Sequence, residues 1–258
     1  MADSSRPEKT IDNIETSRNT ASQLSWYEQR LDYFATCGLS PDRFVDTFPV
    51  FSPRQRVTRF LETLRYWELI EDIPGDIFEC GVAGGEFLMA MAHFSSIYEP
   101  HHYTRKIVGF DTFEGFTPPS EQDMSSGAKH MKAGGLAYDS HAYLQAAIGF
   151  YDQNRMIGNI PKVFLEKGDI SQTLPAYLER NPATVIGLLH MDLDLYKPTL
   201  DVLRAVRKRM AKGSIIIFDE LNHADYPGET LAVMEAIGLE TIELRRVKEA
   251  SMAAYVRL

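Results

Sequence analysis

From Pro74 onward, short apolar runs alternate with longer segments of helical periodicity. This alternation constrains the fold most, because parallel neighbouring strands need a crossover connection, usually a helix, between them. We predict strands at residues 76–80, 106–111, 162–166, 184–192 and 214–219. Helices are predicted at residues 86–98, 173–180 and 199–210. The chain is therefore predicted to be α/β, with a mostly parallel, Rossmann-like sheet.

Two further apolar runs, at residues 240–244 and 252–258, are separated only by residues 245–251. That gap is too short for a crossover helix, so these runs are predicted to form an antiparallel hairpin at the end of the sheet. Class I methyltransferases have this layout, although dehydrogenases can also carry antiparallel edges. Residues 117–141 are rich in Gly, Ser and Pro and lack a clear period, which predicts a long loop that is either functional or disordered.

The N-terminal quarter is predicted to be helical. A helix is expected over residues 11–38, and a second begins at Ser52, where Pro53 and Gln55 complete a capping pattern. Its apolar stripe consists of Val57, Phe60, Leu61 and Leu64. We predict a helical extension at residues 1–73 that acts as a lid or builds an interface in a homo-oligomer, and a main domain at residues 74–258.

Charge and cysteine content exclude several classes of protein. The 36 acidic and 27 basic residues give a net charge of -9, which repels nucleic acid and anionic membranes. With two cysteines, of which Cys80 lies in an apolar run, a disulfide framework is disfavoured and a cytoplasmic location is predicted. Because apolar stretches of about 20 residues are absent from the sequence, no membrane span is expected.

Glycines mark the turn between the first predicted strand and its helix. Gly81 and Gly85 stand where backbone must approach a ligand closely. Glu79 occupies the place of the first glycine in a dinucleotide fingerprint, where a carboxylate would repel a pyrophosphate. The turn therefore favours S-adenosylmethionine over NAD as the cofactor.

Polar residues recur at the ends of the next two strands. Asp111, followed by Thr112, is predicted to accept hydrogen bonds from the cofactor ribose. Gly168, Asp169 and Ile170 are predicted to frame the adenine. Each feature alone also fits an ordinary turn, but the recurrence at successive strand ends favours a cofactor site.

Carboxylates concentrate after the last two parallel strands. Asp192 and Asp194 are two residues apart, so in extended backbone they would point to one side, and Asp219 and Glu220 follow the neighbouring strand. Hard oxygen ligands suit Mg²⁺ or another hard divalent cation. We predict that Asp192, Asp219 and Glu220 bind the metal.

Asp194 is predicted to be the general base. Alternatively, it caps the helix that follows. His223, which follows the Asp219-Glu220 pair closely, is the main alternative base, and His190 and His141 are others. His190 is more typical of a packed or supporting residue.

The chain from about Pro74 resembles the TylF/macrocin O-methyltransferase family, which acts on sugars in natural products. The resemblance rests on five segments: G-D-I-F-E-C-G-V, G-F-D-T-F-E-G-F, K-G-D-I, H-M-D-L-D-L-Y-K-P-T and I-I-F-D-E. It implies a class I fold, S-adenosylmethionine, an N-terminal lid and a divalent metal held by Asp192 and the Asp219-Glu220 pair, with Asp194 as base. Many members have two aspartates where this chain has Asp219 and Glu220.

We therefore predict a Mg²⁺- and S-adenosylmethionine-dependent O-methyltransferase that acts on a hydroxyl of a sugar or glycosylated small molecule. A catechol acceptor is disfavoured, because Leu195 stands where catechol-type enzymes carry a lysine base. The alternatives are a non-catalytic S-adenosylmethionine-binding module and another metal-dependent enzyme on the same scaffold.

Overall fold

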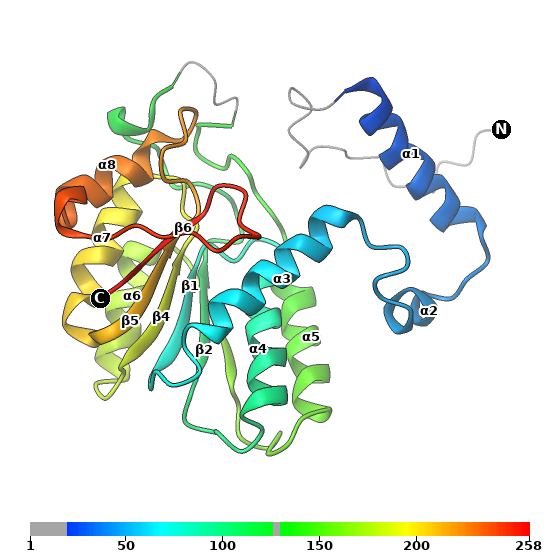
Figure 1. The fold of residues 1–258 in the computed structure, drawn as a ribbon, viewed down its shortest axis with the longest axis horizontal. Helices are drawn as coiled ribbons and strands as arrows, with labels where there is room; N and C mark the ends of the chain where they lie inside the picture. The colour runs from blue at the N-terminus through cyan, green and yellow to red at the C-terminus, as the bar shows by residue number, and fades with distance from the viewer. Residues whose placement is uncertain (1–19, 126–129) are drawn as a thin grey trace. The chain divides into compact units, whose positions relative to one another are not determined.

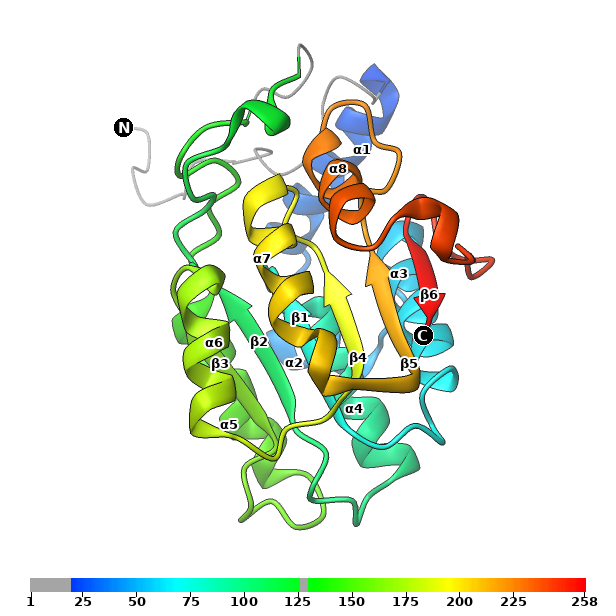
Figure 2. The same cartoon turned by 90° about the vertical axis from the view of Figure 1, so that its left-hand side faces the viewer.

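The computed structural model describes residues 20–125 and 130–258 (Figures 1 and 2). Backbone contacts divide the chain into two compact units, residues 1–54 and 55–258. The start of the predicted helix at 11–38 lies outside the described residues. None of the helices in the described ranges is long and apolar enough to cross a membrane.

The first unit contains helices α1 (Ala21–Thr36) and α2 (Pro41–Asp46). Thr20 and Gln23 form a capping box that satisfies free backbone N–H groups at the start of α1. Phe34, Phe44 and Phe51 form an aromatic cluster with ring centroids 4.8 to 5.8 Å apart. Neither helix has a fully buried residue, so this cluster provides much of the packing within the unit.

The second unit is built on a six-stranded sheet of order β3-β2-β1-β4-β5-β6. The strands are β1 (Asp76–Cys80), β2 (Ile107–Asp111), β3 (Val163–Lys167), β4 (Ile186–Met191), β5 (Met210–Phe218) and β6 (Ala254–Arg257). Strands β1 to β5 are parallel, and β6 pairs antiparallel with β5. The predicted α/β class and mostly parallel sheet are confirmed.

Helices cover both faces of the sheet (Figures 1 and 2). One face packs against α3 (Arg54–Glu68), α4 (Glu86–Tyr98) and α5 (His141–Gln153), and the other against α6 (Ile170–Arg180), α7 (Tyr196–Val206) and α8 (Pro227–Ala236). Neighbouring residues of β1 enter opposite cores: Ile77 joins the first, and Phe78 and Cys80 join the second. Burial on both faces explains the continuously apolar strands.

The predicted hairpin at the C-terminus is wrong in one arm. Residues 252–258 contain β6, but residues 240–244 contain the end of a short 3₁₀ helix (Leu239–Thr241) and irregular backbone. The second arm is reduced to an isolated bridge between Arg245 and Tyr255. An apolar run of five residues did not distinguish a strand from a mostly exposed connection in which only Ile242 is partly buried. Helices α2, α5 and α8 were also not predicted.

Helix α3 belongs to the sheet unit rather than to the first unit. Its fully buried side chains are Glu62, Thr63, Tyr66 and Trp67, whereas Phe60 and Leu61 of the apolar stripe are about 40% exposed. Tyr66 and Trp67 anchor the helix in the core it shares with α4. The polar residues Arg59 and Glu62 are therefore carried to the carboxyl edge of the sheet.

The sheet order reverses between β1 and β4. In open α/β sheets, ligands bind outside the carboxyl ends of the strands at such a switch point. Gly81 and Asp192 follow β1 and β4 there, and the backbone N–H of Asp192 donates to the carbonyl of Cys80 at 2.8 Å. The topology thus places the glycine turn beside the carboxylate cluster.

Candidate active site

A cavity lies at this switch point. It is lined by residues from the loops that follow β1, β2, β3 and β4, including Gly81, Asp111, Asp169, Asp192 and Asp194. The empty space inside it is about 830 Å³, a volume that includes open solvent at its mouth.

The two predicted cofactor glycines have different roles. Gly81 has a φ of +91°, and a Cβ there would lie 1.8 Å from the carbonyl oxygen of Asp192, so only glycine lets the two loops meet. Gly85 begins α4 with a φ of +79°, and a Cβ there would lie 2.3 Å from Cδ2 of Leu144. Gly81 lines the cavity, whereas Gly85 packs against α5 outside the lining.

Asp111 organises the cofactor side of the cavity. Its Oδ2 accepts hydrogen bonds from the backbone N–H groups of Val82 at 2.7 Å and Ala83 at 2.9 Å, and its Oδ1 accepts from Phe113 at 2.6 Å. The neighbouring Thr112 hydroxyl donates to the carbonyl of Gly115. Asp111 therefore ties the β1 turn to the β2 turn, and one lone-pair position of Oδ1 stays available to a ligand.

The turn after β3 contributes Gly168, Asp169 and Ile170 to the cavity lining. Asp169 is also the N-cap of α6, where its side chain accepts a hydrogen bond from the Ser171 N–H at 2.9 Å. This bond fixes the turn and leaves Ile170 beside the cavity. The predicted polar and apolar pair therefore lies at the cavity wall.

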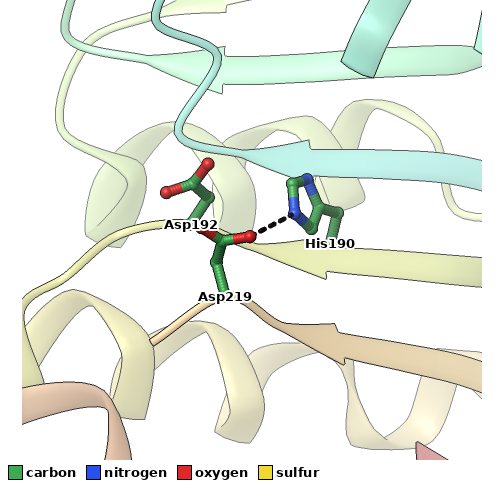
Figure 3. Close-up of side chains that lie close together, drawn as sticks. All are labelled: His190, Asp192 and Asp219. Carbon is green, nitrogen blue, oxygen red and sulfur yellow. Dashed lines mark ion pairs between the residues drawn. The ribbon is translucent and has the colours of Figure 1, made fainter. Parts of the chain in front are cut away.

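Among the described residues, His190, Asp192 and Asp219 form a group whose ligand-type atoms lie within 4.8 Å of one another (Figure 3). His190 and Asp192 come from the end of β4 and the loop after it, and Asp219 follows β5. The register pairs Met191 with Phe218, so the two aspartates leave adjacent strands at the same level.

Arg59 of α3 also reaches this group and was missed in the sequence analysis. Its Nη2 lies 2.9 Å from Oδ1 of Asp219 and 3.8 Å from Oδ2 of Asp192. Its Nη1 lies 3.8 Å from Oε2 of Glu62, one turn further along α3. The available sequence signal was the polar pair Arg59 and Glu62 beside an apolar helical stripe. Such a pair is also typical of the solvent-exposed face of a helix.

His190 is fully enclosed and lies between two carboxylates. Its Nδ1 is 3.8 Å from Glu79, its Nε2 is 3.9 Å from Asp219, and its ring stacks on Phe87 at 4.1 Å. Burial opposes the charged ring, but the two carboxylates outweigh it and raise the pKa of His190 to about 10. Burial raises the pKa of Glu79 to about 7 despite the histidine. Glu79 therefore supports His190 and lies outside the cavity lining.

The pKa values of the two aspartates of the group are shifted in opposite directions. Burial and the charge of Asp219 raise the pKa of Asp192 to about 6. Burial also acts to raise the pKa of Asp219, but His190 and Arg59 lower it below its usual range. Both carboxylates are therefore mostly ionised at neutral pH, and a cation near Asp192 would lower the pKa of that carboxylate.

Glu220 and Glu229 form a second buried acidic pair. Its backbone N–H donates to Oε1 of Glu229 at 3.0 Å, while Oε2 of each glutamate is buried without a hydrogen-bond partner among the described residues. Burial and the surrounding carboxylates raise the pKa of both side chains well above the usual range. Glu220 thus lies beside the cluster but outside the group of three.

Asp194 lines the cavity and does not cap α7. It has a left-handed φ of +58°, so the extended geometry predicted for Asp192 and Asp194 is wrong, although both residues line the cavity. The first N–H of α7, at Tyr196, is bonded at 2.6 Å by the buried carboxylate of Asp123. The capping alternative for Asp194 is therefore wrong. Burial and the nearby carboxylates, Asp192 foremost, raise the pKa of Asp194 well above its usual range.

The alternative bases lie elsewhere. His223 packs against Tyr226, and its Nδ1 is buried without a partner among the described residues. His141 begins α5 and packs against Phe113. Neither these residues nor His190 line the cavity, whereas Asp194 does.

The macrocin O-methyltransferase (TylF) family model matches residues 51–235. The chain belongs to this family. It is therefore an S-adenosylmethionine-dependent O-methyltransferase, as the sequence predicted. The matched region contains every predicted site residue.

Solved structures agree with this assignment. The calicheamicin methyltransferase CalS11 is 31% identical, with a TM-score of 0.88 and 99% of each chain covered. The apo structure of CalS11, described as a TDP-rhamnose 3'-O-methyltransferase, is 32% identical with a TM-score of 0.79, covering 93% of this chain and 95% of that one. The O-methyltransferase NovP has a TM-score of 0.59 at 20% identity over 78% of this chain and 79% of that one, and shows the fold alone. Among curated protein sequences, none matches this chain.

Proposed function

We propose that this macrocin O-methyltransferase family member methylates a hydroxyl of a sugar or glycosylated small molecule. In this proposal, Mg²⁺ or another hard divalent cation is bound by Asp192, Asp219 and Glu220, and Asp194 is the general base. The observation that carries it is the common cavity of Asp111, Asp169, Asp192 and Asp194. The residues proposed to bind the cofactor and those of the carboxylate cluster thus line the same cavity.

The donor set fits a hard divalent cation. Asp192 and Asp219 offer oxygen ligands on adjacent strand ends, and the unpartnered Oε2 of Glu220 lies in the same acidic region. Burial and the neighbouring carboxylates raise the pKa values of Asp192 and Glu220, and a bound cation would favour their ionised forms. When bound, the metal would supply Lewis-acid polarisation of the acceptor oxygen.

The cofactor side fits S-adenosylmethionine, which supplies the methyl group. Asp111 is proposed to accept from the ribose through its available Oδ1 position, with Thr112 beside it. Gly168, Asp169 and Ile170 are proposed to frame the adenine, and Gly81 to allow close backbone approach. Glu79 and Gly85 act through their packing, because neither lines the cavity.

Methyl transfer requires the acceptor oxygen to lose its proton as it attacks the methyl carbon and the bond from that carbon to sulfur breaks. Asp194 is proposed to take this proton in its ionised form, since it lines the cavity beside Asp192. His190 holds Asp219 in place. Within the predicted extension at residues 1–73, α3 is anchored in the sheet unit, so the segment before α3 is proposed as the lid that excludes water.

The acceptor class is inferred from the relatives. The family is named for a macrocin methyltransferase, and one CalS11 structure is titled as an enzyme acting on TDP-rhamnose. A nucleotide-linked or already transferred deoxysugar is therefore the first class to test. The cytoplasmic location stays a prediction.

The test is a methyl-transfer assay on purified full-length protein with S-adenosylmethionine and a panel of nucleotide sugars and glycosides, read by mass spectrometry. We expect a single methylation that EDTA abolishes and Mg²⁺ restores. A catechol panel serves as the control for acceptor class. Full activity after complete chelation would contradict the metal assignment, and methylation of catechols alone would contradict the sugar assignment.

The two alternatives from the sequence analysis have less support. Membership of an enzyme family argues against a non-catalytic binding module. Another reaction on the same scaffold would leave the cofactor-side arrangement of Asp111 and Asp169 without a purpose.

A further inference from the structure

The guanidinium of Arg59 contacts both aspartates that we propose as metal ligands. A single nitrogen, Nη2, lies 2.9 Å from Asp219 and 3.8 Å from Asp192. It therefore faces oxygen atoms that a cation bound by both carboxylates would need. This arrangement rests on the described geometry, whereas the identity of the metal site rests on the proposed function.

The charge of Arg59 cannot be relieved by loss of a proton, because guanidinium stays protonated in proteins. A divalent cation held by Asp192 and Asp219 would repel the guanidinium and compete for the same carboxylate oxygens. Either the cation binds weakly or Arg59 moves away. Arg59 is therefore a competitor of the metal as well as a partner of the carboxylates.

The surroundings allow Arg59 to move. Its side chain is 32% exposed, whereas the side chains of His190 and Asp219 are 3% and 8% exposed. Glu62, the third acidic contact, keeps a hydrogen bond from the Tyr66 hydroxyl at 3.3 Å when Arg59 leaves. The first turns of α3 carry exposed residues, while its C-terminal half is anchored by Tyr66 and Trp67.

We infer that Arg59 is a resident counter-ion of the acidic cluster, which a divalent cation displaces when it binds to Asp192 and Asp219. Arg59 holds the cluster together without metal and lowers its affinity for metal. Displacement also frees the first turns of α3 from the edge of the sheet. Arg59 thus sets the metal concentration at which the site becomes loaded.

The first experiment measures Mg²⁺ and Mn²⁺ binding by calorimetry to the full-length protein, without acceptor. Arg59→Gln removes the competing charge and keeps hydrogen-bonding capacity. We expect the variant to bind metal about tenfold more tightly. A tenfold change corresponds to about 1.4 kcal/mol, which is similar to the contribution of one charge-assisted hydrogen bond. Arg59→Lys, which keeps the charge, should stay nearer to wild type.

Arg56→Gln is the matched control. Arg56 lies three residues earlier on α3, is 63% exposed and pairs with Glu86 at 2.7 Å, away from the cluster. Arg56→Gln changes the net charge by the same amount as Arg59→Gln, so a long-range effect of charge on metal binding would appear in both variants. Its metal affinity should equal that of wild type.

Hydrogen exchange on the wild-type protein provides a readout that needs no variant. Mg²⁺ should accelerate exchange in the first turns of α3, around residues 56–60, and leave the turns around Trp67 unchanged. Unchanged or slower exchange there, or equal or weaker metal binding by Arg59→Gln, would overturn the inference while the metal site stands. If neither wild type nor any variant binds metal, the proposed metal site itself is wrong and the inference fails with it.

Discussion

Both ends of the sheet carry buried charged side chains. At the amino end each buried carboxylate of the cluster is paired with cations, whereas at the carboxyl end it is not. At the amino end, Glu99 lies 3.0 Å from Arg105 and 3.7 Å from Lys162, and Arg105 also donates to the carbonyls of Ile73 and Gly75. Burial acts to raise the pKa of Glu99, but hydrogen bonds from His102 and Ser95 and the charge of Arg105 lower it. This cluster favours the folded state.

At the carboxyl end, carboxylates outnumber cations. Arg59 and His190 face Glu79, Asp192, Asp219 and further acids, and Oε2 of both Glu79 and Glu220 lacks a partner among the described residues. Unpaired buried carboxylates reduce stability. The difference between the two ends indicates that the carboxyl end is arranged for ligands rather than for stability, as expected where local rules are broken at a functional site.

The largest expected effect is on catalysis at the carboxyl end. Asp194→Asn keeps size but removes the proton acceptor, so kcat should fall by roughly 10² to 10⁴. Affinities for Mg²⁺ and S-adenosylhomocysteine should stay near wild type, as measured by calorimetry. A parallel loss of Mg²⁺ affinity would instead make Asp194 a metal ligand.

His223→Gln is the matched control for this assignment. Because His223 does not line the cavity, kcat of the His223→Gln variant should remain near that of the wild type. A large loss in this variant, with Asp194→Asn still active, would transfer the role of base to His223.

The next effect is on stability at the amino end. Glu99→Gln leaves the buried Arg105 and Lys162 without a carboxylate, and we expect a loss of about 3 kcal/mol, the lower end for breaking a buried ion pair. The loss should be near the lower end because Arg105 keeps two carbonyl acceptors. Chemical denaturation at pH 7 measures it, and kcat of the folded variant should be unchanged. A stability change below 1 kcal/mol, or a lower kcat, would remove the contrast between the two ends.

A smaller effect is expected on cofactor binding. Asp111→Ala should weaken S-adenosylhomocysteine binding by about 1.5 to 3 kcal/mol, the contribution of hydrogen bonds to a charged group. Stability should also fall, since the turns at Val82, Ala83 and Phe113 lose their acceptor. Glu114→Ala, at a 74% exposed position in the same turn, is the control and should bind normally. Unchanged affinity in Asp111→Ala would exclude Asp111 from the ribose site.

Much of the fold could be predicted because its strands are buried on both faces. Such strands appear as short apolar runs, and α4 was predicted with its observed bounds, residues 86–98. The predicted hairpin is wrong in its first arm, because residues 240–244 have a strand-like composition but pair with no partner strand in a ladder. The packing of α3 depends on Tyr66 and Trp67 meeting a distant core, which local periodicity does not report.

The site could be predicted where chemistry follows strand ends. Asp111, Asp169, Asp192 and Asp194 all reach one cavity because parallel strands end at one edge. Arg59 could not be predicted, because it arrives from a helix more than a hundred residues earlier in the chain than its partners. The cap on α7 likewise comes from Asp123, a residue of the long loop, rather than from the nearby Asp194.

The last prediction compares the pH dependence of stability at the two ends. The pKa of Glu79 is raised from 4.5 to about 7 in the folded state, so its contribution to stability is full below pH 4.5 and is lost as pH rises through 7. The pKa of Glu99 is lowered, so its contribution is present above the unfolded value and is lost as pH falls. Glu79→Gln should therefore gain about 1 to 3 kcal/mol relative to wild type between pH 5 and pH 8. Glu99→Gln should lose stability relative to wild type at pH 8, and the difference should shrink as pH falls below 4.5 through the lowered folded-state pKa. Denaturation at several pH values without metal measures both differences. Profiles of the same sign would show that the two ends do not differ in charge balance.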